Sequence, residues 1–314
     1  MRLRHATAVT AVLAAASTAL VAGCSSDTGV APGAAGTAAG SGGNGLAASS
    51  AVGKLPVDDA ARKLLPADIR KSGVVKVGGS TDVAPYLSVN GPNLVGVEAD
   101  FMTAIGHTLG VKFEVGNTKF AAMVPGLQSK RFDVAMADFS DTKERQQQVT
   151  FVDYSRAGQI LIVPKGNPLK LKSVPDLCGH GAAGPTGSLS VDIAMAQSKK
   201  CTDAGKPAVK VQRYPTAAES ALALRSGRVD TLAIDYGIAS SLVKQSGGKL
   251  QLVGGLFGKG YHGAAFRKDD TSLQKALAAA FTTIMKDGTY AKILRQWKLP
   301  QMSMDKVVTN GATE

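Results

Sequence analysis

The sequence predicts an α/β protein of about two domains, in which strands alternate with helices. Its 314 residues correspond to about two domains at ~150 residues each. Short apolar runs typical of buried strands alternate with segments of helical apolar spacing, first over residues 74–137 and again over 159–266. A helical region at 272–299 follows without a strand of its own. We therefore expect two similar lobes, with the C-terminal helical region packed back onto one of them.

The first unit contains polar turns that we expect to form a crevice. Strands are expected at 74–77, 94–97, 111–115 and 134–137, and helices at 64–71, 99–109 and 121–129. The helix at 99–109 precedes Gly110, a residue that favours helix C-termini. Alternating strands and helices indicate parallel βαβ units, whose ligands bind at the carboxyl ends of the strands. The turns at 78–86, 118–120 and 137–142 should therefore meet.

The second unit repeats this alternation. Strands are expected at 159–163, 209–213, 229–234, 250–253 and 264–266, and helices at 189–198, 216–226 and 238–245. A Gly-rich stretch, 179–188, leads into the first of these helices, and Asp235 ends the strand at 229–234. The C-terminal helical region has one break, at Asp287–Gly288.

The turn after the strand at 134–137 has the composition of an anion site. Polar residues from Asp138 to Thr142 can cap the short helix that begins with Lys143 and contains Arg145. Strand end, polar turn and helix start place backbone N–H groups, the Ser140 hydroxyl and the Arg145 guanidinium around one small volume. Such a corner suits a carboxylate. From this stretch alone, Arg145 as a solvated helix residue is the alternative.

The N-terminus has the pattern of a targeting segment. Arg2 and Arg4 precede an uncharged apolar stretch, residues 6–22, which ends in small residues. The sequence L-V-A-G-C, ending at Cys24, resembles a bacterial lipobox. This resemblance implies a signal peptide at 1–23, cleavage before Cys24 and attachment of lipid, palmitate included, to its sulfur. An ordinary secretory signal with an incidental cysteine is the alternative.

Residues 24–55 are expected to form a flexible linker after the lipidated cysteine. From Ser25 to about Gly53 the chain is mostly Gly, Ala, Ser and Thr, and it has too few apolar side chains to bury a core. A lipid anchor followed by such a linker would place a soluble domain on the outer face of the bacterial cell membrane.

Charge and cysteine content exclude several functions. The formal net charge is +12, but the basic residues are dispersed and only 5% of residues are aromatic, which argues against nucleic-acid binding. Cys178 and Cys201 form an even pair in an oxidising compartment, which predicts a disulfide. A metal or catalytic cysteine is the alternative, but it lacks ligand spacing. With no P-loop, zincin motif or metal cluster in the sequence, we expect no cofactor and no metal.

Several stretches, in order along residues 72–299, resemble the family 3 extracellular solute-binding proteins, the amino-acid-binding components of bacterial ABC importers. The similar stretches are G-V-V-K-V-G-G-S-T-D-V-A-P-Y, N-L-V-G-V-E-A-D-F-M-T-A-I, F-A-A-M-V-P-G-L-Q-S-K-R-F-D-V, S-D-T-K-E-R-Q-Q-Q-V-T-F, A-L-R-S-G-R-V-D-T-L-A-I-D and K-D-G-T-Y-A-K-I-L-R-Q-W. Each motif alone is weakly specific, but their order and spacing together are specific.

The resemblance implies a two-lobed fold that closes over its ligand like a Venus flytrap. Two hinge strands would join the lobes, with crossovers near 154–158 and 254–262. Lobe 1 would be discontinuous, comprising 56–156 and 261–314, and lobe 2 would comprise 157–260. This arrangement explains why the C-terminal helical region has no sheet of its own.

The resemblance also assigns roles to individual residues. Arg145 would bind the α-carboxylate of the ligand with help from Ser140 and the backbone near Asp138, and Asp235 would bind the α-ammonium. Phe120 would pack on the aliphatic part of the ligand, and the loop Thr186–Gly187–Ser188 would donate to the carboxylate. The alternatives are a helix N-cap for Asp235, plain core for Phe120 and a cap for Ser188.

The chain departs from the family pattern at positions where family members contact the ligand. Ser80 stands where the family usually has an acid and Val83 where it has an aromatic residue, with Tyr86 nearby. We expect Ser80 and Tyr86 to contribute to the site. Leu189 follows Gly187–Ser188 where the family has a threonine, and Asp138 adds a negative charge that reads a cationic group or caps a helix.

We therefore expect a monomeric, lipid-anchored binding protein that delivers an amino acid or related zwitterion to the permease subunits of an ABC importer. One alternative is an enzyme on the same fold, such as a dehydratase, which would need a general acid or base over the ligand. No histidine falls in a pocket turn and each pocket acid has another explanation, so we expect no catalytic residues. A lipoprotein used for sensing or adhesion is the other alternative.

Overall fold

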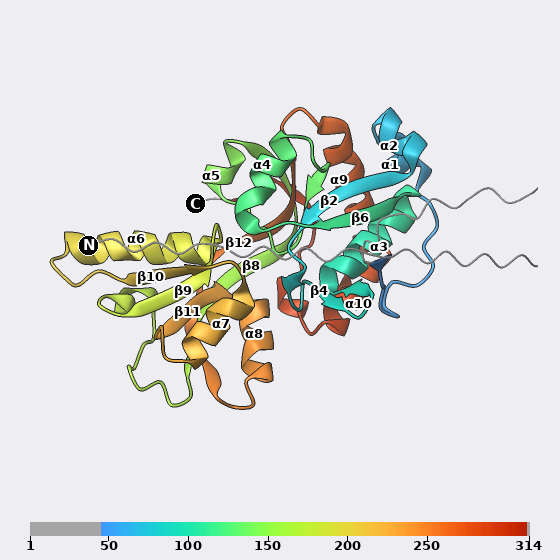
Figure 1. Cartoon of the computed structure of the whole chain (residues 1–314). Coiled ribbons are helices and arrows are strands. Elements are labelled where there is room, and N and C mark those ends of the chain that lie inside the picture. Colours follow the sequence, from blue (N-terminus) through green and yellow to red (C-terminus); the bar gives the residue numbers. More distant parts are fainter. Residues whose placement is uncertain (1–44, 313–314) are drawn as a thin grey trace, which may run out of the picture. The chain divides into compact units, whose positions relative to one another are not determined.

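Two long antiparallel strands connect the parts of the fold. In the computed structural model, which describes residues 45–312, β8 (Val149–Pro164) pairs with β12 (Leu250–Arg267) along nearly their whole lengths (Figure 1). The register of this pairing shifts between Val253 and Phe257, between Phe257 and Gly260, and between His262 and Gly263. These irregularities fall in the stretch where the sequence places the return crossover. The predicted signal peptide, Cys24 and linker residues 24–44 lie outside the described residues.

The two strands sit in the middle of one mixed sheet. Its order is β10-β9-β11-β8-β12-β7-β2-β6, with β13 added beside β8. The remaining strands are β2 (Val74–Gly79), β6 (Lys112–Asn117), β7 (Val134–Ala135), β9 (Gly181–Pro185), β10 (Lys210–Tyr214), β11 (Thr231–Asp235) and β13 (Val308–Thr309). β2 runs parallel to β6 and β7, and β9 runs parallel to β10 and β11. Each half of the sheet is thus the parallel βαβ unit that the sequence predicts, and the result is a two-lobed α/β fold.

Helices cover both halves of the sheet. The first half carries α1 (Asp59–Lys63), α2 (Ala67–Ser72), α3 (Val97–Leu109), α4 (Met123–Gln128), α5 (Lys143–Gln146), α9 (Thr271–Lys286) and α10 (Thr289–Gln296). The second half carries α6 (Leu189–Asp203), α7 (Ala217–Arg225) and α8 (Tyr236–Gln245). The C-terminal helices α9 and α10 pack on α3 (Figure 1), as the sequence predicts. Within residues 45–312, every helix is too short or too polar to cross a bilayer.

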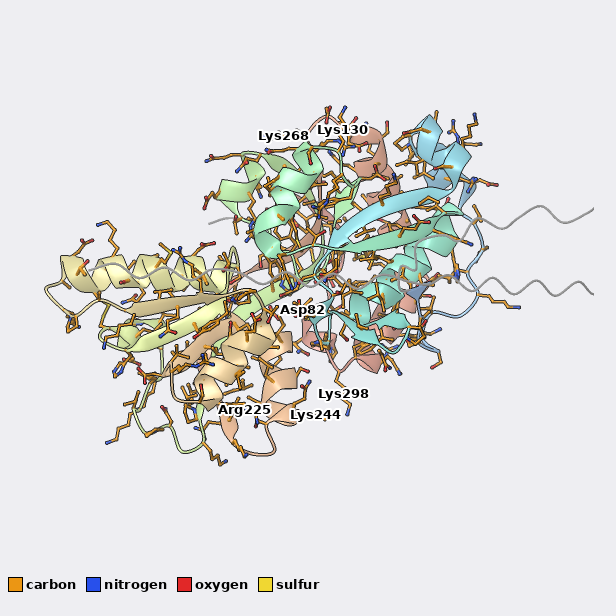
Figure 2. The ribbon with its side chains drawn as sticks, in the orientation of Figure 1. Asp82, Lys130, Arg225, Lys244, Lys268 and Lys298 are labelled. Atoms are coloured by element: carbon orange, nitrogen blue, oxygen red, sulfur yellow. A yellow bond between two sulfur atoms is a disulfide. The ribbon has the colours of Figure 1, made fainter. Side chains whose placement is uncertain are left out.

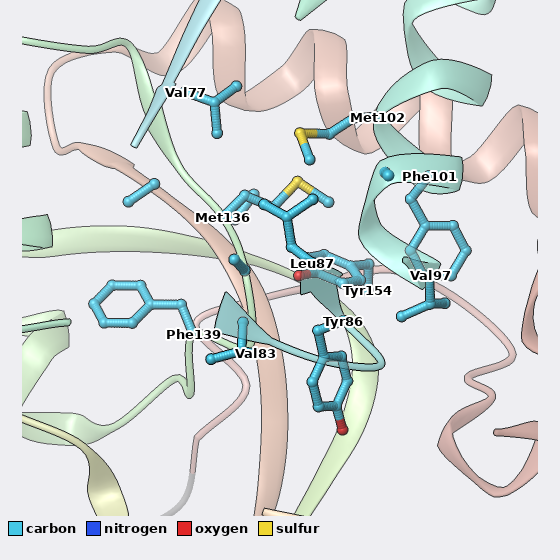
Figure 3. Close-up of a cluster of buried hydrophobic side chains, with 14 of the residues drawn as sticks. Val77, Val83, Tyr86, Leu87, Val97, Phe101, Met102, Met136, Phe139 and Tyr154 are labelled. Carbon is cyan, nitrogen blue, oxygen red and sulfur yellow. The ribbon is translucent and has the colours of Figure 1, made fainter. Parts of the chain in front are cut away.

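An aromatic cluster forms the centre of the first lobe. The Phe101 ring stacks on Tyr290 at 5.3 Å between centroids and meets Tyr154 and Phe281 edge-on, both at 5.7 Å. Tyr154 in turn stacks on Phe281 at 4.9 Å. Because Tyr154 belongs to β8 and Phe281 to α9, the cluster fixes the C-terminal helices to the hinge strand. Figure 3 shows Phe101 and Tyr154 beside the aliphatic part of this core.

Residues 45–53 are packed against the first lobe, although the sequence places them in a flexible linker. β1 (Gly45–Leu46) pairs with β5 (Asn93–Val95) in a small sheet that also contains β4 (Leu87–Asn90) and β3 (Asp82–Val83). The Ser49 hydroxyl and the Trp297 indole both donate to Asp100, at 2.6 and 2.7 Å. The composition of residues 45–53 could not predict this packing, because the residue to which they bind, Asp100, belongs to the lobe.

Local signals explain most element boundaries. Gly110 and Gly288 adopt positive φ angles of 63° and 83°, so they end α3 and separate α9 from α10 as predicted. The helix predicted at 64–71 begins only at Ala67, after Pro66, and a further short helix, α1, precedes it. The stretches at 250–253 and 264–266 belong to one strand, β12. The Gly-rich stretch at 179–188 contains a strand that was not predicted, β9, which is buried between β10 and β11.

Basic side chains are spread over both lobes. The labelled Lys130, Lys268 and Lys298 follow α4, β12 and α10, while Arg225 and Lys244 lie on α7 and α8 (Figure 2). This distribution agrees with the dispersed charge noted in the sequence and differs from the clustered basic surface that binds nucleic acid.

The predicted disulfide between Cys178 and Cys201 is confirmed. The bond joins the loop after the short 3₁₀ helix at Val174–Leu177 to the last turns of α6, with 5.6 Å between the two Cα atoms. Cys201 is buried, and Leu177 and Val209 belong to the same apolar cluster. The bond therefore closes a loop of sequence separation 23 over the second lobe's smaller core.

We expect the Cys178→Ser/Cys201→Ser double variant to lose about 2–4 kcal/mol of unfolding free energy, because the cross-link limits the freedom of the unfolded chain. Urea denaturation measures this loss, and reduction of the wild-type protein should reproduce it. An unreduced, folded wild-type protein in which both thiols react with a maleimide would contradict the assignment.

Candidate functional site

A small cavity lined by both charged and apolar side chains lies where the two halves of the sheet meet. Its volume is about 20 Å³, room for about one water molecule. The lining residues come from both lobes and from β8: Phe120, Asp138, Ser140, Arg145, Gln159, Pro185, Ser188, Leu189, Ser190, Ile234, Asp235 and Ile238. Six of the predicted ligand-binding residues are among them. An amino acid can enter only if the lobes separate.

Arg145 connects loops of the two lobes. The Thr142 hydroxyl caps α5 by accepting from the Arg145 backbone N–H at 3.2 Å. The guanidinium donates to the Ser140 carbonyl at 2.6 Å and to the Gly187 carbonyl at 2.9 Å, and it lies 4.5 Å from the centroid of the Phe139 ring. The side chain thus projects toward the second lobe and is not the solvated residue of the alternative interpretation.

Asp235 is buried at the end of β11, where it also caps α8. Its Oδ1 accepts from the Gly237 backbone N–H at 2.7 Å and from the Tyr86 hydroxyl at 2.5 Å. Tyr86 comes from the first lobe, and its hydroxyl points away from the aliphatic cluster in Figure 3. A Cβ at Gly237 would lie 2.6 Å from that hydroxyl, so glycine permits the contact. The N-cap interpretation of Asp235 is correct, and the carboxylate additionally joins the lobes.

Asp138 is held in a strained backbone. Its φ angle is 54° and that of Ala137 is 141°, both rare for residues with a side chain. The Asp138 backbone N–H donates to Glu98 Oε1 at 2.7 Å, which fixes this turn to the start of α3. The conformation directs the buried carboxylate toward His262 rather than toward a helix end, so the capping alternative for Asp138 is wrong.

His262 is a buried residue beside the cavity that sequence reasoning missed. It is fully buried on β12, and its Nε2 lies 3.0 Å from Asp138 Oδ1 and 3.3 Å from Asp235 Oδ2. The sequence places no histidine in a pocket turn, and His262 instead reaches the two pocket acids from a hinge strand. Its bridge pairing with Ser140 brings it there. One feature of the sequence could have indicated this position: His262 falls within the predicted return crossover, 254–262.

The pKa values of Asp138, His262 and Glu98 differ from their usual values. Burial, with Asp235 as the second cause, raises the pKa of Asp138 to about 7, although His262 opposes the shift. Burial alone would lower the pKa of His262, but Asp138 and Asp235 outweigh it and raise that pKa well above its usual value. Burial also raises the pKa of Glu98. The cluster therefore gains or loses protons near neutral pH.

Among the described residues, this cluster alone has the spacing of a metal site. One ligand atom each from Asp138, Asp235 and His262 lies within 4.8 Å of the others. Histidines that bind metal usually donate their second ring N–H to an acceptor, and His262 Nδ1 has no such partner. Pairing of opposite charges accounts for the three side chains without a metal.

The other predicted residues divide into two groups. Phe120 and Ser188 line the cavity, and the buried Ser188 hydroxyl has no hydrogen-bond partner within residues 45–312. Ser80 and Thr186 lie outside the lining: the Ser80 hydroxyl donates to Asp82 at 2.6 Å, and the Thr186 hydroxyl to the Tyr214 carbonyl at 3.2 Å.

The loop at 186–188 differs from its expected role as a donor. The backbone N–H groups of Thr186 and Ser188 donate to the carbonyls of Tyr214 and Pro185, at 2.8 and 3.1 Å. Gly187 instead offers its carbonyl to Arg145. A Cβ at Gly187 would lie 2.9 Å from Ala121 atoms of the first lobe, so glycine allows this close approach.

The hinge strand adds a polar group that was not predicted. The Ser190 hydroxyl, in the first turn of α6, donates to Gln159 Oε1 at 2.7 Å. Gln159 belongs to β8 and pairs with Asp235 across the sheet. Ile234 and Ile238 complete the apolar part of the lining. Strand and helix positions such as these carry no motif that marks them as functional.

A second buried acid pair lies beside the site. Asp153 on β8 accepts from the Gly311 backbone N–H at 2.8 Å, and Asp141 accepts from the Ala312 backbone N–H at 3.0 Å. Burial and the neighbouring Asp141 raise the pKa of Asp153 to about 8. The pair connects the C-terminal residues to the loop that carries Ser140.

We expect Asp153→Asn to stabilise the protein relative to wild type more at pH 8 than at pH 5. The folded-state pKa of about 8 lies above the usual 3.8, so the unfolded chain releases a proton that the folded wild type retains. Wild-type stability is therefore lost as the pH rises between these values, and asparagine cannot ionise. Urea denaturation across this pH range gives the stability difference, and a difference independent of pH would contradict the shift.

Comparison with known proteins places the chain among binding proteins. The sequence profile of the bacterial extracellular solute-binding proteins, family 3, matches residues 75–300. The chain is 26% identical over 251 residues to the arginine-binding protein ArgT of Corynebacterium glutamicum, covering 79% of this chain and 81% of the relative. It is 28% identical over 249 residues to the L-cystine-binding protein TcyJ of Escherichia coli K12, covering 78% and 90%. A solved ancestral arginine-binding protein bound to arginine is 36% identical, with a TM-score of 0.66, covering 72% and 98%.

Proposed function

Because the chain belongs to the bacterial extracellular solute-binding proteins of family 3, we propose that it captures an amino acid between its two lobes. The observation that carries this proposal is the placement of Arg145 and Asp235. They come from different lobes and line one cavity. A guanidinium and a carboxylate held in one site select a molecule that carries both an anionic and a cationic group.

The contacts of these two side chains indicate how a ligand would bind. The ligand carboxylate would take the guanidinium donors that now reach the Ser140 and Gly187 carbonyls. Its ammonium would bind to Asp235 and Asp138, and its aliphatic part would lie against Phe120. Since Arg145 and Asp235 both make contacts across the lobes, exchanging these contacts for a ligand couples binding to hinge motion.

The site and the similar proteins indicate the α-amino and α-carboxylate groups of the ligand more clearly than its side chain. The named ligands of the similar proteins are arginine and cystine, which share the α-amino and α-carboxylate groups but differ in side-chain charge. We therefore propose the class of α-amino acids, with L-arginine as the first compound to test.

The location and partners follow from the family and the N-terminal sequence. We propose that residues 1–23 are removed, that Cys24 is lipidated and that the domain works at the outer face of the cell membrane. As a monomer, it would deliver its ligand to the permease subunits of an ABC importer. We propose lobe 1 as 56–156 and 261–314, and lobe 2 as 157–260.

Enzymatic activity is the second candidate, and one observation favours it. Asp138, whose pKa burial and Asp235 raise to about 7, exchanges a proton near neutral pH, as general acid–base catalysis requires, and His262 lies beside it. His262 does not line the cavity, however, so it would act only through an acid. Incubating the protein with each ligand that binds, followed by mass spectrometry of the solution, separates the candidates: a product indicates an enzyme, and unchanged ligand a binding protein.

A thermal-shift screen against the twenty L-amino acids, amines and small sugars tests the ligand class. A ligand at 100 times its Kd should stabilise the protein by about 2.7 kcal/mol. We expect a shift with one group of amino acids and none with sugars. No shift with any α-amino acid would contradict the proposal.

We expect Arg145→Ala to weaken binding of that amino acid by about 10- to 100-fold, because a charged hydrogen-bonding partner of the carboxylate is lost. Lys143→Ala is the matched control, since Lys143 is an exposed cation of the same helix, α5. Calorimetric titration measures both affinities. Equal affinities of the two variants for the amino acid would contradict the proposal that Arg145 binds its carboxylate.

A further inference from the structure

The charges around His262 come from separate elements that meet at the hinge. Asp138 follows β7 in the first lobe, Asp235 ends β11 in the second lobe, and His262 lies on β12, which connects them. All three side chains are buried, with exposed fractions of 7%, 4% and 0%. One imidazole therefore faces the two acids to which the proposed ligand ammonium would bind.

Attraction of charge, rather than aligned hydrogen bonding, holds the imidazole there. Its Nε2 lies 3.0 and 3.3 Å from the two carboxylates, yet neither ring nitrogen makes a well-directed hydrogen bond. The Tyr86 ring packs edge-on against it at 5.2 Å between centroids. An imidazole placed between two acids in this way can lose its charge without breaking a network of directed bonds.

We propose that His262 is a positioning residue for the ammonium site, and that a ligand ammonium bound by Asp138 and Asp235 displaces a proton from the His262 cluster. The inference rests on the proposed function and adds that the positive charge of the ligand is exchanged for a proton of the protein. The only chemical step is proton transfer to solvent, directly or through Asp138.

The surrounding groups determine the direction of this exchange. The groups that face His262 are Tyr86 before β4, Glu98 on α3, Asp138, Asp153 on β8 and Asp235. Four of these groups are carboxylic acids and one is a phenol, so within residues 45–312 none of the groups named here is a cation. Arg145 lines the same cavity, but its guanidinium is directed to the Ser140 and Gly187 carbonyls. A bound ammonium would be a cation placed directly against the two acids, where it would repel an imidazolium and lower the pKa of His262 and of Asp138.

Ligand affinity should consequently rise with pH. A site that releases one full proton on binding gains about tenfold in affinity per pH unit while the proton is still bound in the free protein. Asp138, with a pKa of about 7, places this dependence around neutral pH. A ligand held only by Arg145 would show no such dependence.

The first experiment needs no identified ligand. NMR of the imidazole resonances of the purified chain follows each histidine from pH 5 to 9, and the His262→Gln variant assigns the His262 signal by its loss. We expect His262 to be charged at pH 7, and methylammonium to lower its pKa by about one unit relative to the same concentration of tetramethylammonium, which has no N–H donor. A neutral His262 at pH 7, or equal pKa values with the two salts, would overturn the proposal.

The second experiment uses any L-amino acid that gives a thermal shift. Calorimetry in buffers of different ionisation enthalpy should detect proton release with the wild type. In His262→Gln the pH at which affinity rises should move upward, because the imidazole that lowers the pKa of Asp138 is lost. A purely structural role for His262 would leave the pH profile of the affinity at the same position in the variant, and this result would overturn the proposal. If methylammonium shifts His262 but no amino acid binds, the proposed function fails and the His262 assignment stands.

Discussion

The burial of the Asp235 carboxylate is the constraint on which the rest of the structure depends. An unpaired charge in the protein interior costs several kcal/mol or more, so Asp235 needs partners wherever the lobes meet. It finds them in its own helix at Gly237, in the first lobe at Tyr86 and on the hinge strand at His262. Because these partners belong to different parts of the fold, the pairing of a single side chain governs how the lobes contact each other.

Arg145 has the complementary role on the other side of the cavity. Its guanidinium satisfies carbonyls of both lobes, at Ser140 and Gly187, and leaves a cavity of only about 20 Å³. The groups that would bind a zwitterion thus satisfy one another when the lobes meet. A ligand has to replace these contacts with comparable ones, which explains how a binding protein of this kind can reject molecules that carry only one of the two charges.

The sequence predicted the two-lobed α/β fold, because apolar periodicity, Gly110 and Gly288 mark elements locally and the family motifs give their order. Strand order placed the turn that carries Asp138 at the crevice, and the resemblance to the family brought Arg145 and Asp235 to the same site. His262, Gln159 and Ser190 escaped prediction because their position depends on the pairing of β8 with β12 and β11 across the hinge. Ser80 and Thr186 were placed in the site by motif position, yet neighbouring acceptors at Asp82 and Tyr214 take their hydroxyls.

The measurement that tests this account most directly is the distance between the lobes in solution. Fluorescent labels at Lys130 and Lys206, both exposed and on different lobes, report this distance by single-molecule energy transfer. With a saturating amino acid, we expect the distribution to narrow to one population, and we expect Asp235→Asn to prevent the narrowing. An unchanged distribution in the wild-type protein, with binding verified by calorimetry, would contradict closure between Arg145 and Asp235.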